Sequence, residues 1–198
     1  MSSSIQKIDI QALSLQDAVL GKGARLCNIV GKHDAQVFWR PGHFMDVAFE
    51  PQGYNDPEAN RVNLSLRPTQ AVIDAVRELD DFLVQHIAQH SERILGKALD
   101  EPAVRDRYQS CLKSNDRYPL PTLRCKLTHS GRGAASIWSV AGQPMAAPDS
   151  WVGCGAQVNL QLKSLYVMSG AKEFGPIFEV RDVMLDVRAQ VCPFVSDF

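Results

Sequence analysis

Cationic and aromatic side chains that could bind a polyanion are concentrated in the second half of the chain. Six basic residues stand between positions 117 and 172 against one acidic residue, whereas residues 1–116 and 173–198 each have a net charge of −3. Single-stranded nucleic acid is bound by cations that follow its phosphates and by flat rings on which its bases stack. The candidate nucleic-acid-binding residues are therefore Arg117, Tyr118, Arg124, Lys126, Arg132, Trp138, Lys163, Tyr166 and Lys172.

Two of these cations share one face of a predicted strand. Arg124 and Lys126 alternate with apolar residues, so both basic side chains project from the same side of an extended segment. Trp39 on an earlier strand could extend the aromatic platform. Two alternatives stay open: the basic excess could be ordinary solvated surface, and Trp138 and Tyr166 could be core residues.

No pattern of residues composes an active site. His86 and His90 are spaced to lie on one face of a helix, but Ile87 occupies the position where a zinc protease motif requires glutamate. The sequence contains neither a complete phosphate-binding loop nor a G-x-S-x-G nucleophile motif. We therefore expect no enzymatic activity, no cofactor and no metal. A metal-dependent nuclease using the two histidines stays open as a minor alternative.

The elements that must position the candidate residues begin with short β-type runs. Extended segments are predicted at 26–30, 36–39, 44–49 and 62–66, separated by turn residues in the manner of a meander. Helical spacing of apolar residues then predicts a helix between Thr69 and Gly96. A second helix is predicted to start at Asp100, to carry Tyr108 and Cys111 on one face, and to end before Asn115.

The β pattern returns after Pro121. Segments 122–128 and 134–138, joined by a glycine-rich turn at 131–133, predict a hairpin. A long alternating strand starts at Ala156, and its parity shifts between Leu162 and Leu165, which predicts a bulge. A last strand, about 174–187, returns across the turn at 169–172. The expected fold class is mainly β (β-rich α+β): an antiparallel barrel with an inserted pair of helices at about 69–114.

Composition limits the setting in which this fold works. At 45% hydrophobic residues the chain can bury a core, and we expect one domain over 1–187 followed by a tail over 188–198. No apolar run is long enough to cross a bilayer, and the polar first residues do not form a signal peptide. Five cysteines without a C-x-x-C pair argue against a disulfide framework. We expect an intracellular protein, in cytoplasm or nucleus, without a membrane partner.

Several segments resemble one known family. They are the helical stretch 66–97, the second helix with Tyr108, the run 118–127 (YPLPTLRCKL), and the closing segments 165–167, 174–175 and 180–183. Together these stretches, within about 62–187, are similar to the single-stranded DNA-binding proteins of nucleo-cytoplasmic large DNA viruses and of short-tailed coliphages.

The resemblance implies an OB-type barrel with a groove for single-stranded DNA, acting in replication, recombination or repair, in an infected cell if the chain is viral. In that family an acidic tail ending in an aromatic residue recruits replication proteins and competes with DNA. This chain ends in Asp197 and Phe198 but lacks the long acidic run. Phage relatives are dimers, so a homodimer is a further expectation.

Two alternatives to this reading stay open at the level of the sequence. RNA could replace DNA as the ligand, because stacking does not distinguish ribose from deoxyribose. A protein-interaction adaptor without nucleic-acid affinity would use the same surface differently, with the basic residues as ordinary surface. It predicts co-purification with a partner.

Overall fold

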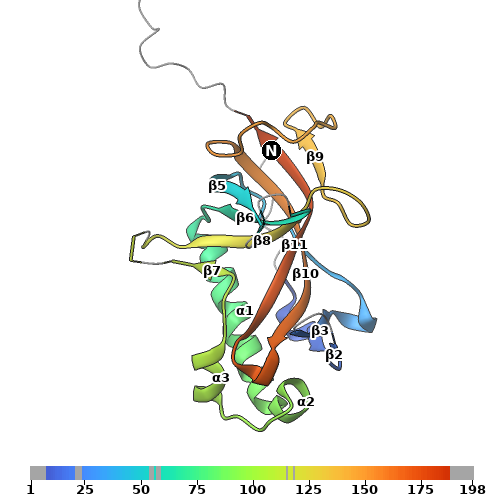
Figure 1. Cartoon of the computed structure of the whole chain (residues 1–198), viewed down its shortest axis with the longest axis vertical. Coiled ribbons are helices and arrows are strands. Elements are labelled where there is room, and N and C mark those ends of the chain that lie inside the picture. Colours follow the sequence, from blue (N-terminus) through green and yellow to red (C-terminus); the bar gives the residue numbers. More distant parts are fainter. Residues whose placement is uncertain are drawn as a thin grey trace, which may run out of the picture.

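The computed structural model describes residues 8–20, 24–53, 56, 59–114, 116–117 and 119–187, and its architecture is mainly β with helices inserted midway (Figure 1). The predicted tail over 188–198 lies outside these residues. The strands are β1 (Ser14–Leu15), β2 (Val19–Leu20), β3 (Ala24–Val30), β4 (Val37–Trp39), β5 (Met45–Gln52), β6 (Arg61–Leu66), β7 (Leu112–Lys113), β8 (Thr122–Thr128), β9 (Ser136–Ser139), β10 (Gly155–Met168) and β11 (Phe174–Asp186). The α-helices are α1 (Gln70–Gln89), α2 (Ser91–Leu95) and α3 (Glu101–Arg107), and the 3₁₀ turns are η1 (Ile10–Ala12), η2 (Lys32–Asp34) and η3 (Ser169–Ala171).

Strand pairing returns on itself to form a closed ring. β10 pairs with β11 and β5, β5 with β6, β6 with β8, and β8 with β11. The long β10–β11 hairpin runs the height of the molecule, and β8 crosses it at mid-height (Figure 1). The pairings are antiparallel except that β11 meets β8 and β9 in parallel, so the predicted all-antiparallel sheet is wrong at these two contacts.

Two predicted local pairings are also wrong. β8 and β9 do not form a hairpin: a hydrogen bond from the Ala135 amide to the Thr128 carbonyl closes the turn (2.9 Å), after which β8 pairs with β6 and β9 with β11. Of the predicted meander only the β5–β6 pair is present, because β3 and β4 both pair with β10 instead of with each other. β9, β3 and β4 thus pair with the long central hairpin instead of with their sequence neighbours.

The predicted bulge in β10 is confirmed. Pairing with β11 shifts register between Leu162 and Ser164, so Lys163 is the extra residue on β10. A second shift, opposite Asn159 and Leu160, makes Arg181 the extra residue on β11. Each bulge therefore adds a basic residue to the strand pair.

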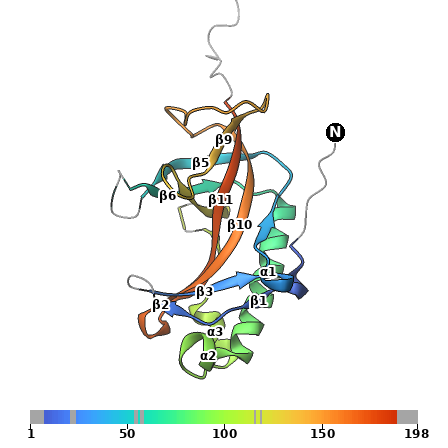
Figure 2. The ribbon, with the colours of Figure 1, turned by 90° about the vertical axis from the view of Figure 1, so that its right-hand side faces the viewer.

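The helices fill the space behind the lower half of the central hairpin (Figures 1 and 2). α1 follows Thr69, and Gly96 follows α2 in a left-handed conformation, so the two ends of the predicted helix are confirmed. The single helix predicted between them is wrong, because the backbone of His90 is not helical (φ −123°, ψ 25°) and divides it into α1 and α2. The insertion therefore contains α1, α2 and α3 rather than a pair of helices. Asp100 caps α3 by accepting a hydrogen bond from the Ala103 amide (3.0 Å).

The predicted second helix is too long. α3 ends at Arg107, and Tyr108 is already extended and bridges Phe174. The Gln109 amide donates to the Phe174 carbonyl (2.8 Å), and a Cβ on Gly175 would lie 2.1 Å from the Gln109 carbonyl oxygen. Backbone pairing with β11, made possible by Gly175, therefore replaces the last predicted helical turn.

The core lies between the ring and the helices. The alternation in β10 is as predicted, with Ala156, Val158, Leu160 and Leu162 fully buried. The four described cysteines are buried free thiols. Among the described residues no helix is long and apolar enough to span a membrane.

Candidate nucleic-acid interface

The register of the ring aligns one row of side chains across its outer face. Residues paired directly across strands lie on the same face of a sheet. The pairings 38–161, 161–179, 179–126, 126–63 and 63–52 connect one strand to the next. The row is Phe38, Gln161, Glu179, Lys126, Asn63 and Gln52. None of these except Gln161 and Glu179 is buried, and both of those are polar.

Glu179 is the centre of a cationic cluster on this face. Its carboxylate accepts a hydrogen bond from the Arg61 guanidinium (2.7 Å) and from the Lys163 ammonium (2.9 Å), and Arg181 lies 3.6 Å away. The Glu179 side chain is only 10% exposed. Arg181 is oriented further by the Gln161 side-chain oxygen, which accepts from its guanidinium. One carboxylate thus fixes three cations from β6, β10 and β11.

The two cations of β8 adjoin this cluster. Lys126 donates to the Asn63 side chain (2.8 Å), and Arg124, paired with Ser65, is exposed. Partial burial lowers the pKa of Lys126, and the positive charges of Arg61 and Arg124 lower it further. The predicted common face of Arg124 and Lys126 is present, and the cations on it repel one another.

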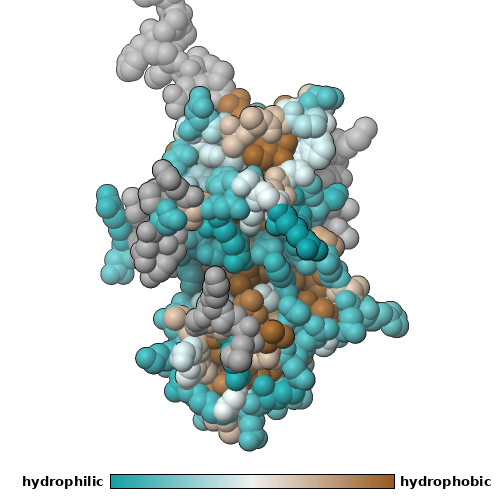
Figure 3. Space-filling model, turned by 45° about the vertical axis from the view of Figure 1, so that its right-hand side comes forward, coloured by the Kyte–Doolittle hydropathy of each residue, from teal (hydrophilic) through white to brown (hydrophobic). Residues whose placement is uncertain are grey.

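The surface is hollowed beside the cluster. A cavity of about 590 Å³ lies where β6 begins and β8 ends, and its lining includes Arg61, Arg132, Lys163 and Arg181. Arg132 reaches it from the turn between Gly131 and Gly133, both at positive φ. Hydrophilic side chains form a band across the middle of the visible face in Figure 3, at the height where β8 and β11 cross in Figure 1.

Aromatic rings flank the cations. Phe38 is 43% exposed, although its neighbours Val37 and Trp39 are buried. Trp39 packs against Phe178 in the core, so the prediction that it extends the aromatic platform is wrong, and Phe38 occupies that place. Phe38 alternates outward because it pairs with the outward-facing Gln161.

Trp138 is half-buried at one end of the face. Its indole N–H donates to Asp182 (3.4 Å), whose other carboxylate oxygen accepts from Asn159 (2.9 Å). Trp138 lines a cavity of about 350 Å³ together with Arg40 and Met184. The indole ring therefore lies at a surface hollow, and Trp138 is not a core residue.

The structure does not bring every predicted residue to this face. Tyr166 is half-buried lower on β10; burial raises its pKa to about 12, and the Glu173 carboxylate contributes. Lys172 lines a separate pocket at the lower end of the hairpin. Arg117 is exposed in the connection between β7 and β8. Tyr118, Asp197 and Phe198 lie outside the described residues.

The two histidines considered as metal ligands are His86 on α1 and His90, the residue directly after α1. The rings of His86 and His90 are 4.8 Å apart, centre to centre. Within the described part of the chain no group of three or more His, Cys, Asp or Glu side chains could hold a metal ion.

Sequence reasoning missed Arg61, Arg181, Glu179 and Phe38. Counting charge in consecutive stretches assigned Arg61 and Arg181 to the two acidic parts of the chain. The alternation of Arg61, Asn63 and Ser65 with apolar residues was a usable signal, since it is the same pattern that identified Arg124 and Lys126. Glu179 and Phe38 follow only from the strand register.

Comparison with known proteins finds similarity in structure and not in sequence. No protein-family model matches the chain, and no curated protein matches it in sequence. The single-stranded DNA-binding protein from bacteriophage Enc34 is similar over 86% of this chain and 88% of its own, with 10% identity and a TM-score of 0.44. A C-terminal truncation of that protein is similar over 89% and 97%, with 9% identity and a TM-score of 0.45.

Proposed function

We propose that this protein binds single-stranded DNA, without marked sequence preference, across the outer face of the strand ring. The observation that carries the proposal is the assembly of five cations from four strands on one face, flanked by exposed Phe38 and half-buried Trp138. These cations are Arg61, Arg124, Lys126, Lys163 and Arg181. We further propose that the closed ring of pairings is an OB-type barrel, with α1–α3 as its insertion.

The arrangement separates the two tasks of such a site. Phosphates would lie along the cations beside the hollow of Arg61 and Arg132, and their binding releases counterions and depends on salt. Bases would stack on Phe38 and Trp138, which accept any base because every base presents a flat face. Glu179 keeps the cations in place before DNA arrives, at the cost of one negative charge on the face.

The test is fluorescence anisotropy with labelled oligo-dT, the same sequence as a duplex, and an equivalent RNA, in a series of salt concentrations. The wild-type chain should prefer oligo-dT, and its affinity should fall steeply with salt. The Arg124→Ala/Lys126→Ala variant should bind at least about tenfold more weakly, with a smaller salt dependence.

A matched control removes one lysine and one arginine elsewhere. Lys32 and Arg77 are exposed on η2 and α1, and Lys32 makes only a loose 3.8 Å pair with exposed Asp9. The Lys32→Ala/Arg77→Ala variant should bind like wild type. No binding at low salt would reject the proposal and favour a protein-interaction adaptor, and equal or tighter binding to the RNA would make RNA the ligand.

The proposal also includes a cellular role and protein partners. We propose that the protein acts inside the cell in DNA replication, recombination or repair, with replication proteins contacting the tail that ends in Asp197 and Phe198. Deleting residues 188–198 should leave the cationic face intact and, if the tail competes for it, tighten oligo-dT binding. Light scattering with and without oligo-dT tests the expected homodimer.

A further inference from the structure

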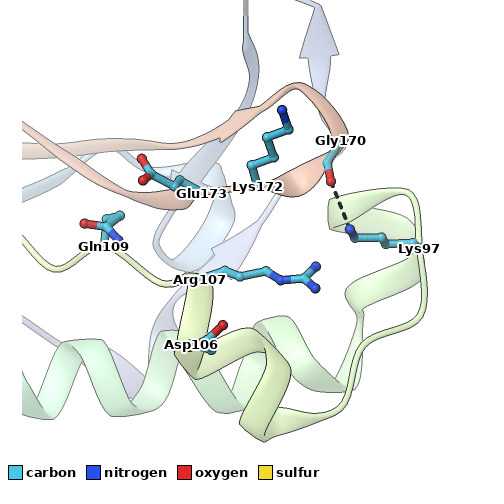
Figure 4. Close-up of a pocket in the computed structure, with 7 residues that line it drawn as sticks. All are labelled: Lys97, Asp106, Arg107, Gln109, Gly170, Lys172 and Glu173. Carbon is cyan, nitrogen blue, oxygen red and sulfur yellow. Dashed lines mark hydrogen bonds between the residues drawn. The ribbon is translucent and has the colours of Figure 1, made fainter.

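A second basic pocket lies at the lower end of the β10–β11 hairpin, away from the cationic face. It has a volume of about 380 Å³ and lies between the loop after α2, the end of α3 and the 169–172 turn (Figure 4). Lys97, Arg107 and Lys172 supply three cations from these elements, and Asp106 and Glu173 supply two carboxylates. The pocket therefore keeps a net positive charge.

The pocket is held in shape by the backbone. The Lys97 ammonium donates to the Gly170 carbonyl oxygen (2.9 Å), joining the α2–α3 connection to the turn. The turn itself is constrained, because Gly170 and the buried, non-glycine Ala171 both have positive φ (69° and 49°). A left-handed alanine is unfavourable and persists only where the surroundings fix it. The turn thus fixes the backbone from which the exposed Lys172 side chain extends, and in Figure 4 the Lys172 ammonium points away from Arg107.

Two of the cations remain available to a ligand. Among the described residues the side chains of Arg107 and Lys172 have no hydrogen bond or ion pair, whereas the Lys97 ammonium is bonded to Gly170. In Figure 4 the guanidinium of Arg107 extends into the space toward Lys97, while the Glu173 carboxylate points away from it. Half-buried Arg107 can donate two parallel hydrogen bonds to one anion, the geometry that suits phosphate.

The same hairpin connects this pocket to the cationic face. Lys163 belongs to the Glu179 cluster, and Met168 precedes the turn that carries Lys172. The five residue steps along β10 from Lys163 to Met168 span about 17 Å at a strand rise of about 3.4 Å per residue. Half-buried Tyr166 lies on this stretch. A single DNA strand that leaves the cationic face along β10 would reach the pocket within a few nucleotides.

We propose that the pocket of Lys97, Arg107 and Lys172 binds a backbone phosphate of the same DNA strand whose middle lies on the cationic face. This inference rests on the proposed function and adds to it a second anchor and a minimum length of DNA. Oligonucleotides that cover only the central face should not reach the pocket, and longer ones should.

The test compares wild type with Arg107→Ala/Lys172→Ala, using oligo-dT from about 4 to about 30 nucleotides, which brackets known site sizes of roughly 4–16 nucleotides per OB fold. Lys97 is left intact because it holds the turn. The double variant should bind the shortest detectable oligonucleotides like wild type and long ones about five- to tenfold more weakly. Its salt slope on long oligonucleotides should be smaller by about 0.7, the value for one phosphate on a single strand.

The outcomes separate this inference from the proposed function. Wild type that binds no oligonucleotide defeats both, whereas equal binding of wild type and variant at every length overturns only the second anchor. A loss that is the same at all lengths also overturns it, because it would reflect general electrostatics; Lys32→Ala/Arg77→Ala measures that background. Saturable binding of inorganic phosphate that the variant loses, without a change in oligonucleotide affinity, would make the pocket a free-anion site instead.

Discussion

Two regions of the molecule enclose a carboxylate, and they use it in opposite ways. Glu179, on the outer face, lies among Arg61, Lys163 and Arg181. Asp80, on α1, lies among hydroxyls: it accepts from Tyr108 (2.6 Å) and from Ser110 (2.5 Å). The first carboxylate organises charges at the surface, and the second fastens α1 to the extended segment after α3.

The Asp80 carboxylate is partly removed from water, and this shifts the pKa values of the groups around it. Burial raises the pKa of Asp80, and its hydrogen bonds to Ser110 and Tyr108 offset that rise only in part. Burial next to Asp80 also raises the pKa of Tyr108 well above its usual value. Asp80, Tyr108 and Ser110 form a partly buried hydrogen-bonded junction between α1 and the segment after α3, so changes there should alter stability. Changes on the cationic face should alter affinity.

The largest effect should come from removing the junction carboxylate. Asp80→Ala leaves the Tyr108 and Ser110 hydroxyls without their acceptor and should lower the free energy of unfolding by about 2–4 kcal/mol. Urea unfolding followed by circular dichroism measures it, and oligo-dT affinity of the folded variant should not change. The neighbouring Asp81, whose exposed carboxylate pairs with Arg105, is the control. Asp81→Ala should cost under about 1 kcal/mol, and equal losses would remove the contrast between the two regions.

The next effect belongs to the aromatic edge of the face. Phe38→Ala should weaken oligo-dT binding about tenfold, in line with about 1–3 kcal/mol per stacked base, and the loss should persist at high salt. Because Phe38 is 43% exposed, unfolding should change little. Phe38→Leu keeps an apolar side chain without a ring and should lose as much affinity, whereas Phe38→Tyr should retain it. If leucine binds like wild type, the contribution of Phe38 is not stacking.

The sequence predicts the parts of this structure whose causes are local. Apolar spacing locates the helical segment of α1 and α2, although not its break at His90. Alternation places Arg124 and Lys126 together, and the parity shift in β10 marks the bulge at Lys163. Contacts between distant segments decide the rest. α3 stops at Arg107 because Gln109 pairs with Phe174, and Arg61 joins Arg181 only because β6, β8 and β11 are neighbours. Residue order does not contain that adjacency in any local pattern.

A smaller effect, opposite in sign, is expected at the surface carboxylate. Glu179→Gln removes the one negative charge in the cluster of Arg61, Lys163 and Arg181. Oligo-dT affinity at low salt should rise about threefold, and the gain should fade as salt screens the cations. Anisotropy titrations at two salt concentrations measure this. Asp182→Asn, a carboxylate that holds Trp138 rather than a cation, is the comparison, and it should not tighten binding. If the Glu179→Gln variant binds oligo-dT more weakly than wild type, ordering of the cations matters more than their net charge.

The smallest effect concerns pH and the buried side of α1. The Nε2 atom of His86 is buried without a partner among the described residues, and burial lowers the pKa of His86, with His90 and Arg93 adding to the shift. Since the folded pKa lies below the unfolded value of 6.5, this histidine favours the folded state less as pH falls below 6.5. Thermal unfolding of wild type and His86→Leu between pH 7.5 and about 5 should show the wild type losing more stability. The control is His43→Leu, because His43 is exposed, and its stability should depend on pH as that of the wild type does. If the stability of His86→Leu also depends on pH as that of the wild type does, protonation of His86 does not contribute to acid sensitivity.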